Sequence, residues 1–214
     1  WKNVFDGKFM RARSNGGWWT PFNPYEVNNN YTEANAWQYR FYVPQDMKSL
    51  KKYLGGANAL EQALDELFTA STDLKGRGQA DITGLIGQYA HGNEPSHHMA
   101  FLYHYTRHPL KSSYYTQRIM KALYHNAPDG LSGNEDCGQM SAWYVLSALG
   151  LYPIAPGKPV YQIGRPLMNS ATIKLENGKS IYLKCQDQSK QNTYIKEVRW
   201  NGQKLEKMEI SHAQ

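Results

Sequence analysis

The segment NALEQALDELFTA, residues 58–70, gives the clearest sign of how this chain folds. Its leucines Leu60, Leu64 and Leu67 recur at helical spacing, which predicts an amphipathic helix with one apolar face. The stretch before it, QDMKSLKKYL at 45–54, has the same period and is followed by two glycines, a common helix end. Two helices in direct succession predict a helical hairpin.

Further helical patterns lie on both sides of this hairpin. Before it, ANAWQYRFYV at 34–43 predicts a short helix that Pro44 ends. After a glycine-rich loop at 75–87, SHHMAFLYHYT at 96–106 and LKSSYYTQRIMKALYH at 110–125 predict a second pair of helices.

A last helix is predicted from CGQMSAWYVLSALG at 137–150. Asn134 or Asp136 is expected to be its N-cap, because side chains of these types accept hydrogen bonds from the free N–H groups of a helix start. Gly150 is expected to end it. Successive hairpins of this kind predict part of an α/α toroid or a bundle.

Beyond these helices the apolar period changes to two. ATIKLENGKSIYLKC at 171–185 and YIKEVRWNGQKLEKMEI at 194–210 each predict strands around an Asn-Gly turn. The chain is therefore expected to be mainly α with a C-terminal β region, divided into a helical part at 1–155 and a β part at 156–214.

Composition excludes several classes of protein. The 214 residues are 41% hydrophobic and 20% charged, as in ordinary globular proteins, and no apolar run reaches the ~20 residues of a membrane span. The net charge is +6, but the excess of basic residues is spread along the predicted strands without a cluster, which argues against nucleic-acid binding. Cys137 and Cys185 lie in different parts of the chain and form no CxxC pair.

Aromatic residues make up 13% of the chain, and many stand beside polar residues. Aromatic rings with polar neighbours suit the binding of carbohydrate rings. The alternative is that these aromatic side chains pack in the core.

The candidate catalytic and metal-binding residues lie at three junctions between a loop and a helix. In NNNYTEANAWQYR at 28–40, Glu33 stands among Tyr31, Trp37 and Tyr39, and a carboxyl group among aromatic faces is poorly solvated. Poor solvation raises the pKa of Glu33 and allows it to act as a general acid. The alternative is a glutamate that only stabilises a helix N-terminus.

The second junction is HGNEPSHH at 91–98. Asn93 and Glu94 offer oxygen ligands from a stiff turn, which suits a hard cation such as calcium. Zinc is the alternative, because His97, His104 and His108 share helical spacing, but no HExxH pattern completes the site. Packing or hydrogen bonding is the commoner role for such histidines.

The third junction is GLSGNEDCGQMSAWY at 130–144, where Glu135 and Asp136 precede a helix. The N–H groups of a helix start stabilise negative charge, which favours a carboxylate that serves as a general base. Capping of the helix is the plainer alternative. In an α/α toroid the helix starts converge on one face, so these junctions are expected to share a pocket. Two carboxyl groups with separated pKa values are the groups that glycoside hydrolysis uses.

Long stretches of the chain resemble one enzyme family. YTEANAWQYRFYVPQD, HGNEPSHH and GNEDCGQMSAWYVLSALGLYPIAPG are similar to segments of the calcium-dependent exo-acting α-mannosidases of glycoside hydrolase family 92. NVFDGKFMRAR, YQIGRP and YIKEVRWNG resemble further segments of that family. The resemblance implies a β-sandwich followed by an (α/α)6 barrel, inverting chemistry, and a calcium ion that binds the terminal mannose. One position departs from the pattern, since Gln45 stands where a histidine is expected.

The resemblance also implies residue roles. Glu33 would be the general acid and Asp136 the general base, with Glu135 as second choice. Asn93 and Glu94 would bind calcium, with Gln88 as a third ligand. The sugar contacts would come from aromatic and histidine side chains, namely Trp18, Trp19, His91, His97 and His98.

The expected substrate is a terminal α-mannoside or N-glycan, most often α-1,2-linked, and the expected location is the bacterial periplasm or the outside of the cell. The family's β-sandwich and early barrel helices would precede residue 1, so this C-terminal portion alone is expected to be weakly active or inactive. The alternatives are a non-catalytic carbohydrate-binding module, indifferent to loss of Glu33, and another α/α-toroid glycosidase, which would need no calcium at the sugar.

Overall fold

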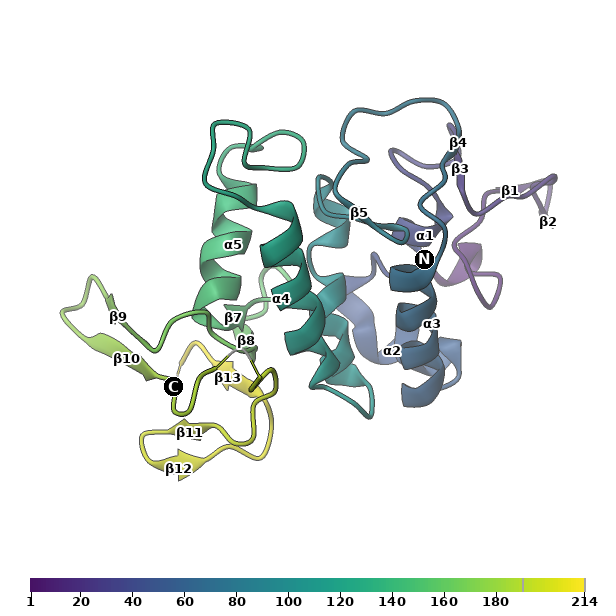
Figure 1. The fold of residues 1–214 in the computed structure, drawn as a ribbon. Helices are drawn as coiled ribbons and strands as arrows, with labels where there is room; N and C mark the ends of the chain where they lie inside the picture. Colours follow the sequence, from purple (N-terminus) through teal and green to yellow (C-terminus); the bar gives the residue numbers. More distant parts are fainter. Residues whose placement is uncertain (190, 214) are drawn as a thin grey trace.

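The computed structural model describes residues 1–189 and 191–213. The described helices all lie within the first 149 residues, with short strands among them, and only strands follow α5 (Figure 1). The α-helices are α1 (Ala36–Tyr39), α2 (Met47–Leu54), α3 (Ala57–Thr69), α4 (Lys111–Leu123) and α5 (Gln139–Leu149). The 3-10 helices are η1 (Lys2–Val4), η2 (Pro44–Asp46), η3 (Glu94–Ser96) and η4 (Met99–Tyr105). Within the described residues no helix combines the length and apolar character that crossing a membrane requires.

Most of the strand pairings in the described chain are only two residues long. Two-residue pairs join β1 (Arg13–Ser14) to β2 (Gly17–Trp18), β3 (Glu26–Val27) to β4 (Lys75–Gly76), β5 (Leu85–Ile86) to β6 (Tyr89–Ala90), and β11 (Arg199–Trp200) to β12 (Gln203–Lys204). A longer hairpin joins β9 (Ser170–Lys174) to β10 (Ser180–Lys184). The one three-stranded sheet of the described chain has the order β13–β8–β7, from Glu209–Ser211, Val160–Ile163 and Leu151–Tyr152. Since β7 directly follows α5, this sheet connects the β region to the helices.

The predicted α2–α3 hairpin is confirmed. The leucine face of α3 is fully buried, and α2 ends at Gly55 in the left-handed conformation, with φ 106°. The short helix before Pro44, the helices α4 and α5, and the strands around the two Asn-Gly turns are also confirmed.

The helix predicted at 96–106 is present as η4, but it is a 3-10 helix in which every side chain from Met99 to Tyr103 is buried. One local prediction is wrong. The N-cap of α5 is Gly138 and not Asn134 or Asp136, because residues 136–138 turn through the left-handed region and place a glycine at the helix start.

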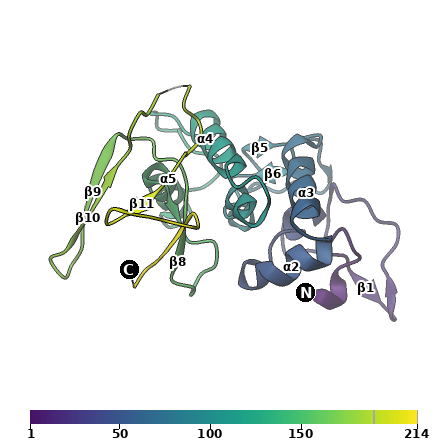
Figure 2. The same cartoon turned by 90° about the horizontal axis from the view of Figure 1, so that it is seen from below.

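Aromatic rings hold the core together between α3 and α4. Phe68 of α3 stacks on Tyr115 of α4 at 3.9 Å between ring centroids, and Tyr103 of η4 stacks on Tyr115 at 5.2 Å. Figure 2 shows the β5–β6 hairpin between these two helices. The N–H of Gln88 in its turn donates to the carbonyl of Leu67 at 2.8 Å, so the hairpin rests on the end of α3.

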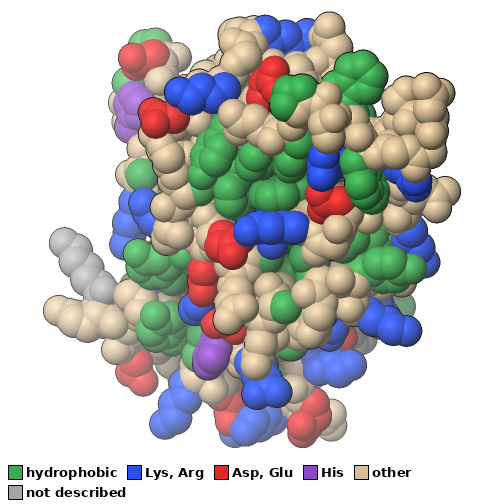
Figure 3. All heavy atoms as spheres, turned by 90° about the vertical axis from the view of Figure 1, so that its right-hand side faces the viewer, with side chains coloured by type: hydrophobic (Ala, Val, Ile, Leu, Met, Phe, Trp, Pro, Cys, Tyr) green, Lys and Arg blue, Asp and Glu red, His purple; other side chains and the backbone are tan. Residues whose placement is uncertain are grey.

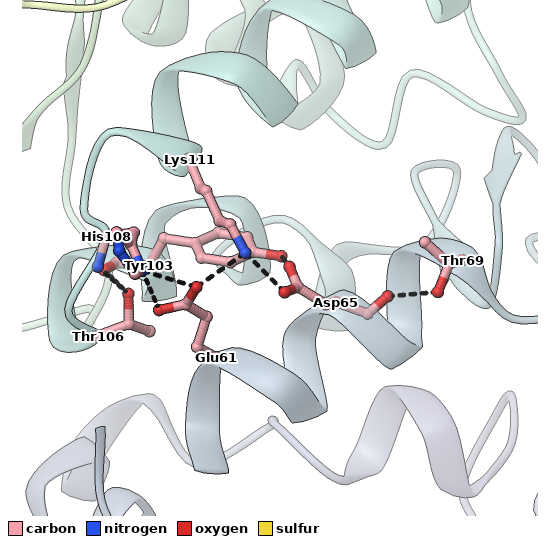
Figure 4. A network of polar contacts seen from close by, with 7 residues as sticks. All are labelled: Glu61, Asp65, Thr69, Tyr103, Thr106, His108 and Lys111. Carbon is pink, nitrogen blue, oxygen red and sulfur yellow. Dashed lines mark hydrogen bonds and ion pairs between the residues drawn. The ribbon is translucent and has the colours of Figure 1, made fainter. Parts of the chain in front are cut away.

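A polar network ties α3 to the segment that carries η4 and α4 (Figure 4). Lys111 Nζ lies 2.8 Å from Glu61 Oε1 and 2.6 Å from Asp65 Oδ2. The Tyr103 hydroxyl donates to Asp65 Oδ1 at 2.8 Å, and His108 Nδ1 lies 2.8 Å from Glu61 Oε1. Burial raises the pKa of Glu61, but the hydrogen bonds from Lys111 and His108 outweigh it and lower that pKa below its usual value.

Lys111→Met is expected to lower the free energy of unfolding by about 1 kcal/mol, because it leaves two carboxylates without their shared cation in a partly exposed site. A carboxylate with a lowered folded pKa stabilises only while it is ionised, so this contribution disappears as the pH falls through the folded pKa of Glu61. Urea unfolding at neutral and acid pH measures both effects. Lys121→Met, on the exposed side of the same helix, is the control, and an equal loss in both variants would contradict the prediction.

Hydrophobic side chains gather on the face that carries the N-terminal segment, as Figure 3 shows. The exposed large apolar residues between positions 1 and 54 are Val4, Trp18, Trp19, Tyr42 and Tyr53. An apolar face of this kind marks a surface that packs against another protein segment or binds a ligand.

Candidate active site

A small apolar cluster, separate from the main core, lies beneath the predicted junctions. Its buried members are Val27, Ala34, Ile82 and Ala90. Ala34 directly follows Glu33, Ile82 follows Asp81, and Ala90 precedes His91. Burial of these apolar side chains against one another therefore draws three polar loops together.

The loop formed by residues 79–84, here called the bridging loop, contacts the first and third junctions. Gln79 Oε1 accepts a hydrogen bond from the N–H of Ala34 at 2.7 Å. Asn134 Nδ2 donates to Asp81 Oδ1 at 3.3 Å. The segment after Glu33 and the segment before Asp136 are thus attached to one loop.

The same loop holds the second junction through a close backbone contact at Gly92. The N–H of Gly92 donates to the carbonyl of Thr83 at 3.1 Å. A Cβ atom at Gly92 would collide with Thr83 Oγ1 and would lie 3.0 Å from the Asp81 carbonyl oxygen and 3.1 Å from that of Ser132. Only glycine lets the three loops approach this closely.

Glu33 is half-buried in the region where the loops meet. Its pKa is raised, first by burial and then by the negative charges of Glu94, Asp81 and Asp136. The direction agrees with the sequence-based expectation, and the structure adds the like charges as a second cause. Burial and the charges of three carboxylates from three other loops therefore hold Glu33 toward its protonated form.

The two carboxylates of the third junction differ in their surroundings. Glu135 accepts hydrogen bonds from the Ser141 backbone N–H at 3.2 Å and from the Ser141 hydroxyl at 3.1 Å, so its carboxylate serves the first turn of α5. Asp136 makes no side-chain hydrogen bond or ion pair with the residues that the structure describes, and its backbone has φ 53°. Asp136 is therefore the carboxylate available to a water molecule.

The expected cation ligands include a buried amide whose oxygen has no partner among the described residues. Asn93 is 1% exposed; its Nδ2 donates to Gln38 Oε1 at 3.0 Å, while its Oδ1 has no partner within residues 1–189 and 191–213. Glu94, the next residue, is exposed. Gln88 is also 1% exposed, and its Oε1 accepts from Asn35 at 2.9 Å, which leaves one lone pair for another donor or a metal.

This arrangement fits a hard cation better than zinc. The unpartnered amide oxygen of Asn93 and the exposed carboxylate of the next residue, Glu94, are oxygen ligands of the kind that calcium prefers. Across the described part of the chain, no three His, Cys, Asp or Glu side chains lie close enough to hold a metal ion. A cation here would therefore need amide, backbone or hydroxyl oxygens in addition to carboxylates.

The histidines of the second junction are buried and hydrogen-bonded. His91 Nδ1 lies 2.7 Å from the Tyr89 hydroxyl and Nε2 lies 2.6 Å from that of Tyr124. His97 Nε2 donates to the His91 carbonyl at 2.9 Å, and Gln139 Nε2 donates to His97 Nδ1 at 3.1 Å. Burial lowers the pKa of His91 to about 2 and that of His97 to about 4, so both rings are neutral.

The remaining histidines do not join them in a metal site. His98 Nε2 donates to the Phe41 carbonyl at 2.8 Å, and burial lowers the pKa of His98 to about 4. His108 is exposed and bound to Glu61. The zinc alternative built on His97, His104 and His108 is therefore wrong, since no such ligand group forms among the described residues.

The two tryptophans lie on or beside the β1–β2 hairpin. Trp18 packs against the Arg13 guanidinium at 4.9 Å from the ring centroid. Trp19 is 53% exposed and lines a small hollow together with Asn30 and Tyr31, which precedes Glu33 by two positions. Trp19 therefore has the freer ring face and the closer connection to the first junction.

Sequence reasoning missed two polar residues of this region. Asp81 lies in the glycine-rich stretch 75–87, which was interpreted only as a loop, yet its charge acts on Glu33. Gln38 lies inside a predicted helix, where a polar residue is normally solvated, yet it is buried and bound to Asn93. A buried polar residue beside a junction shows no periodic signal, so the sequence alone did not mark either one.

Comparisons with known proteins agree on one family. The model of the glycosyl hydrolase family 92 catalytic domain matches residues 1–214. A family 92 α-mannosidase from Bacteroides thetaiotaomicron, solved with mannoimidazole, has a TM-score of 0.91 and 39% identity over 99% of this chain and 29% of its own. A family 92 inverting mannosidase from the same organism has a TM-score of 0.84 and 32% identity over 99% of this chain and 30% of its own.

A curated relative from Arthroderma benhamiae, described as an uncharacterized secreted glycosidase, is 28% identical over 99% of this chain. The chain spans 29% of that relative's length.

Proposed function

Because the chain belongs to glycoside hydrolase family 92, we propose that it contributes the acid, base and metal groups of an enzyme that hydrolyses terminal α-linked mannose. The observation that carries the proposal is the raised pKa of Glu33 in a cluster where Asp136 remains free of hydrogen bonds from the described residues. One carboxyl group held toward protonation and another held available are the two groups that glycoside hydrolysis requires.

In the proposed reaction Glu33 donates its proton to the glycosidic oxygen as the bond from that oxygen to the anomeric carbon breaks. A water molecule attacks the anomeric carbon from the opposite face, and Asp136 takes the proton that this water releases. Glu135 is the second choice for the base, and its hydrogen bonds to Ser141 favour Asp136. An inverting enzyme needs roughly 6.5–9.5 Å between the two carboxyl groups, so that the water fits between them.

Asn93 and Glu94 are the proposed calcium ligands, with Gln88 as a third. The free Oδ1 of Asn93 supports this choice. When bound, calcium would hold hydroxyl oxygens of the terminal mannose and favour the flattened ring that resembles the transition state. The negative charges around Glu33 favour a cation in the same region.

The sugar platform is proposed to be Trp19, with Trp18 beside it. The neutral, buried rings of His91, His97 and His98 support a role in holding the loop that the sugar meets. The preferred linkage is proposed to be α-1,2, in N-glycans or related mannosides, and the place of action to be outside the cytoplasm, which the description of the secreted Arthroderma relative supports.

The helices α1–α5 are proposed to form part of an (α/α)6 barrel, completed by segments that lie outside these 214 residues. The chain spans less than a third of its structural relatives, and we therefore expect residues 1–214 alone to be weakly active or inactive.

The experiment that tests the proposal measures mannose released from α-1,2-mannobiose, with calcium present and then with a chelator. The whole polypeptide that the gene encodes, here called the full-length protein, and residues 1–214 alone are assayed side by side. We expect release by the full-length protein that a chelator abolishes and added calcium restores. Release that is indifferent to chelation would contradict the calcium role, and sugar binding without any release would favour the carbohydrate-binding module.

Asp81→Asn is expected to shift the basic limb of the activity profile to lower pH. The charge of Asp81 raises the pKa of Glu33, so its removal lowers that pKa and deprotonates the acid at a lower pH. The Asn side chain keeps an oxygen to accept from Asn134. The kcat/KM profile measures the shift, and Glu176→Gln, in the β9–β10 turn, is the control; a basic limb unchanged in Asp81→Asn would contradict the prediction.

A further inference from the structure

The helix α1 follows the proposed acid directly and holds the proposed metal loop by two amide pairs. Asn35 Nδ2 donates to Gln88 Oε1 at 2.9 Å, and Asn93 Nδ2 donates to Gln38 Oε1 at 3.0 Å. All four side chains are at most 1% exposed. A helix of four residues is not stable by itself, so these contacts help to fix its position relative to the loop.

The orientation of the first pair is fixed by its other partners. Gln88 Nε2 donates both of its hydrogens, to the backbone carbonyls of Ser71 and Asp73 at 2.6 and 3.1 Å. Gln88 therefore turns its oxygen toward Asn35. The Asn35 oxygen in turn accepts from the Trp37 N–H at 3.1 Å and caps α1. This pair anchors the start of the helix.

The second pair leaves one polar atom free on each side chain. Asn93 Oδ1 and Gln38 Nε2 have no partner in the described part of the chain, although both residues are buried. A buried amide oxygen without a partner is unfavourable, and a bound ligand would remove that cost. Because Gln38 accepts from the Nδ2 of Asn93, it is the oxygen of Asn93 that remains free. The reversed amide would turn N–H groups toward that place and repel a cation.

We propose that Gln38 is a positioning residue for the cation: its side-chain oxygen binds the amide nitrogen of Asn93 and so keeps the oxygen of Asn93 free to bind the metal. This inference rests on the proposed function, since it assigns a role at the calcium site proposed there. Through the same contact, the helix that follows Glu33 moves together with the metal loop. This contact thereby fixes the position of the proposed acid, Glu33, relative to the cation.

The test compares calcium affinity in two variants of the full-length protein, by isothermal titration without sugar. Gln38→Met keeps the approximate volume but removes the acceptor, and it is expected to weaken calcium binding about 10–100-fold, the usual effect of losing a group that orients a metal ligand. Gln38→Glu keeps an acceptor oxygen and is expected to bind calcium at least as tightly as the wild type.

A matched control is Gln117→Met, which alters a buried glutamine of α4 whose Nε2 also lacks a partner among the described residues. It is expected to leave calcium affinity unchanged. Circular dichroism shows whether each variant is folded, and the rise in melting temperature with added calcium gives a second measure of binding.

The outcomes separate this inference from the proposed function. A folded Gln38→Met that binds calcium as tightly as the wild type would overturn the positioning role. Equal weakening in Gln38→Met and Gln38→Glu would also overturn it, because packing rather than the acceptor oxygen would then be responsible. A wild-type protein that binds no calcium would overturn the metal assignment itself, and this inference with it.

Discussion

Glu33→Gln in the full-length protein is expected to lower kcat on α-1,2-mannobiose by about 10²–10⁴-fold and to change KM by only a few-fold. The amide keeps the shape of the side chain and its place among the loops, but it has no proton to give to the glycosidic oxygen. Burial and the like charges nearby hold Glu33 toward its protonated form, and this readiness to donate a proton is lost with the substitution.

A substrate with a better leaving group provides the control for this variant. An α-mannoside of a strongly acidic phenol needs little protonation as the bond breaks, so Glu33→Gln is expected to hydrolyse it at close to the wild-type rate. An equal loss on both substrates would mean that the substitution damages the site as a whole. An unchanged rate on mannobiose would remove Glu33 from the role of acid.

Gly92→Ala is expected to lower kcat/KM at least 100-fold and to destabilise the protein by about 1–3 kcal/mol. The added methyl group collides with Thr83 Oγ1 and crowds the carbonyl oxygens of Asp81 and Ser132. These two oxygens are backbone atoms, which cannot rotate away. The bridging loop and the second and third junctions must then move apart. Displacements of about 1 Å in a catalytic site cost on the order of 100-fold in rate.

Gly78→Ala is the matched control for this variant. Gly78 lies just before the bridging loop, and a Cβ atom there would meet nothing within 4 Å. Activity and melting temperature are expected to stay at wild-type values. If Gly92→Ala were equally harmless, the close contact of the three loops would not be needed for catalysis.

The regular elements could be predicted from the sequence because local pattern and tertiary packing agree there. In α3 the helical spacing of leucines coincides with the face that the core buries. In η4 the two disagree, since all side chains from Met99 to Tyr103 are buried and no polar face remains to define a period. The start of α5 was missed because three successive residues with positive φ, a tertiary feature, precede it.

The long motifs of the sequence predict the parts of the candidate site but not how they meet. They place Glu33, Asn93 and Asp136 at separate junctions, and the structure brings Glu33 within electrostatic reach of Glu94 and Asp136. Asp81 could not be predicted, because its influence depends on a fold that packs Ile82 against Ala34 and Ala90. The zinc alternative failed for a different reason, since hydrogen bonds within the protein engage the rings of two of its three candidates, His97 and His108.

The bridging loop and the β1–β2 hairpin are expected to differ in how far their sequence and length can change between related proteins. Among the described residues the strands of the hairpin pair only with each other, so its length and its tryptophan are expected to change without moving the carboxyl groups. The bridging loop is hydrogen-bonded to Ala34, Gly92 and Asn134, so an insertion there would displace the segments next to Glu33, Asn93 and Asp136. New substrate preferences are therefore expected to arise by changes in the hairpin, while the bridging loop is expected to stay unchanged together with the proposed catalytic groups.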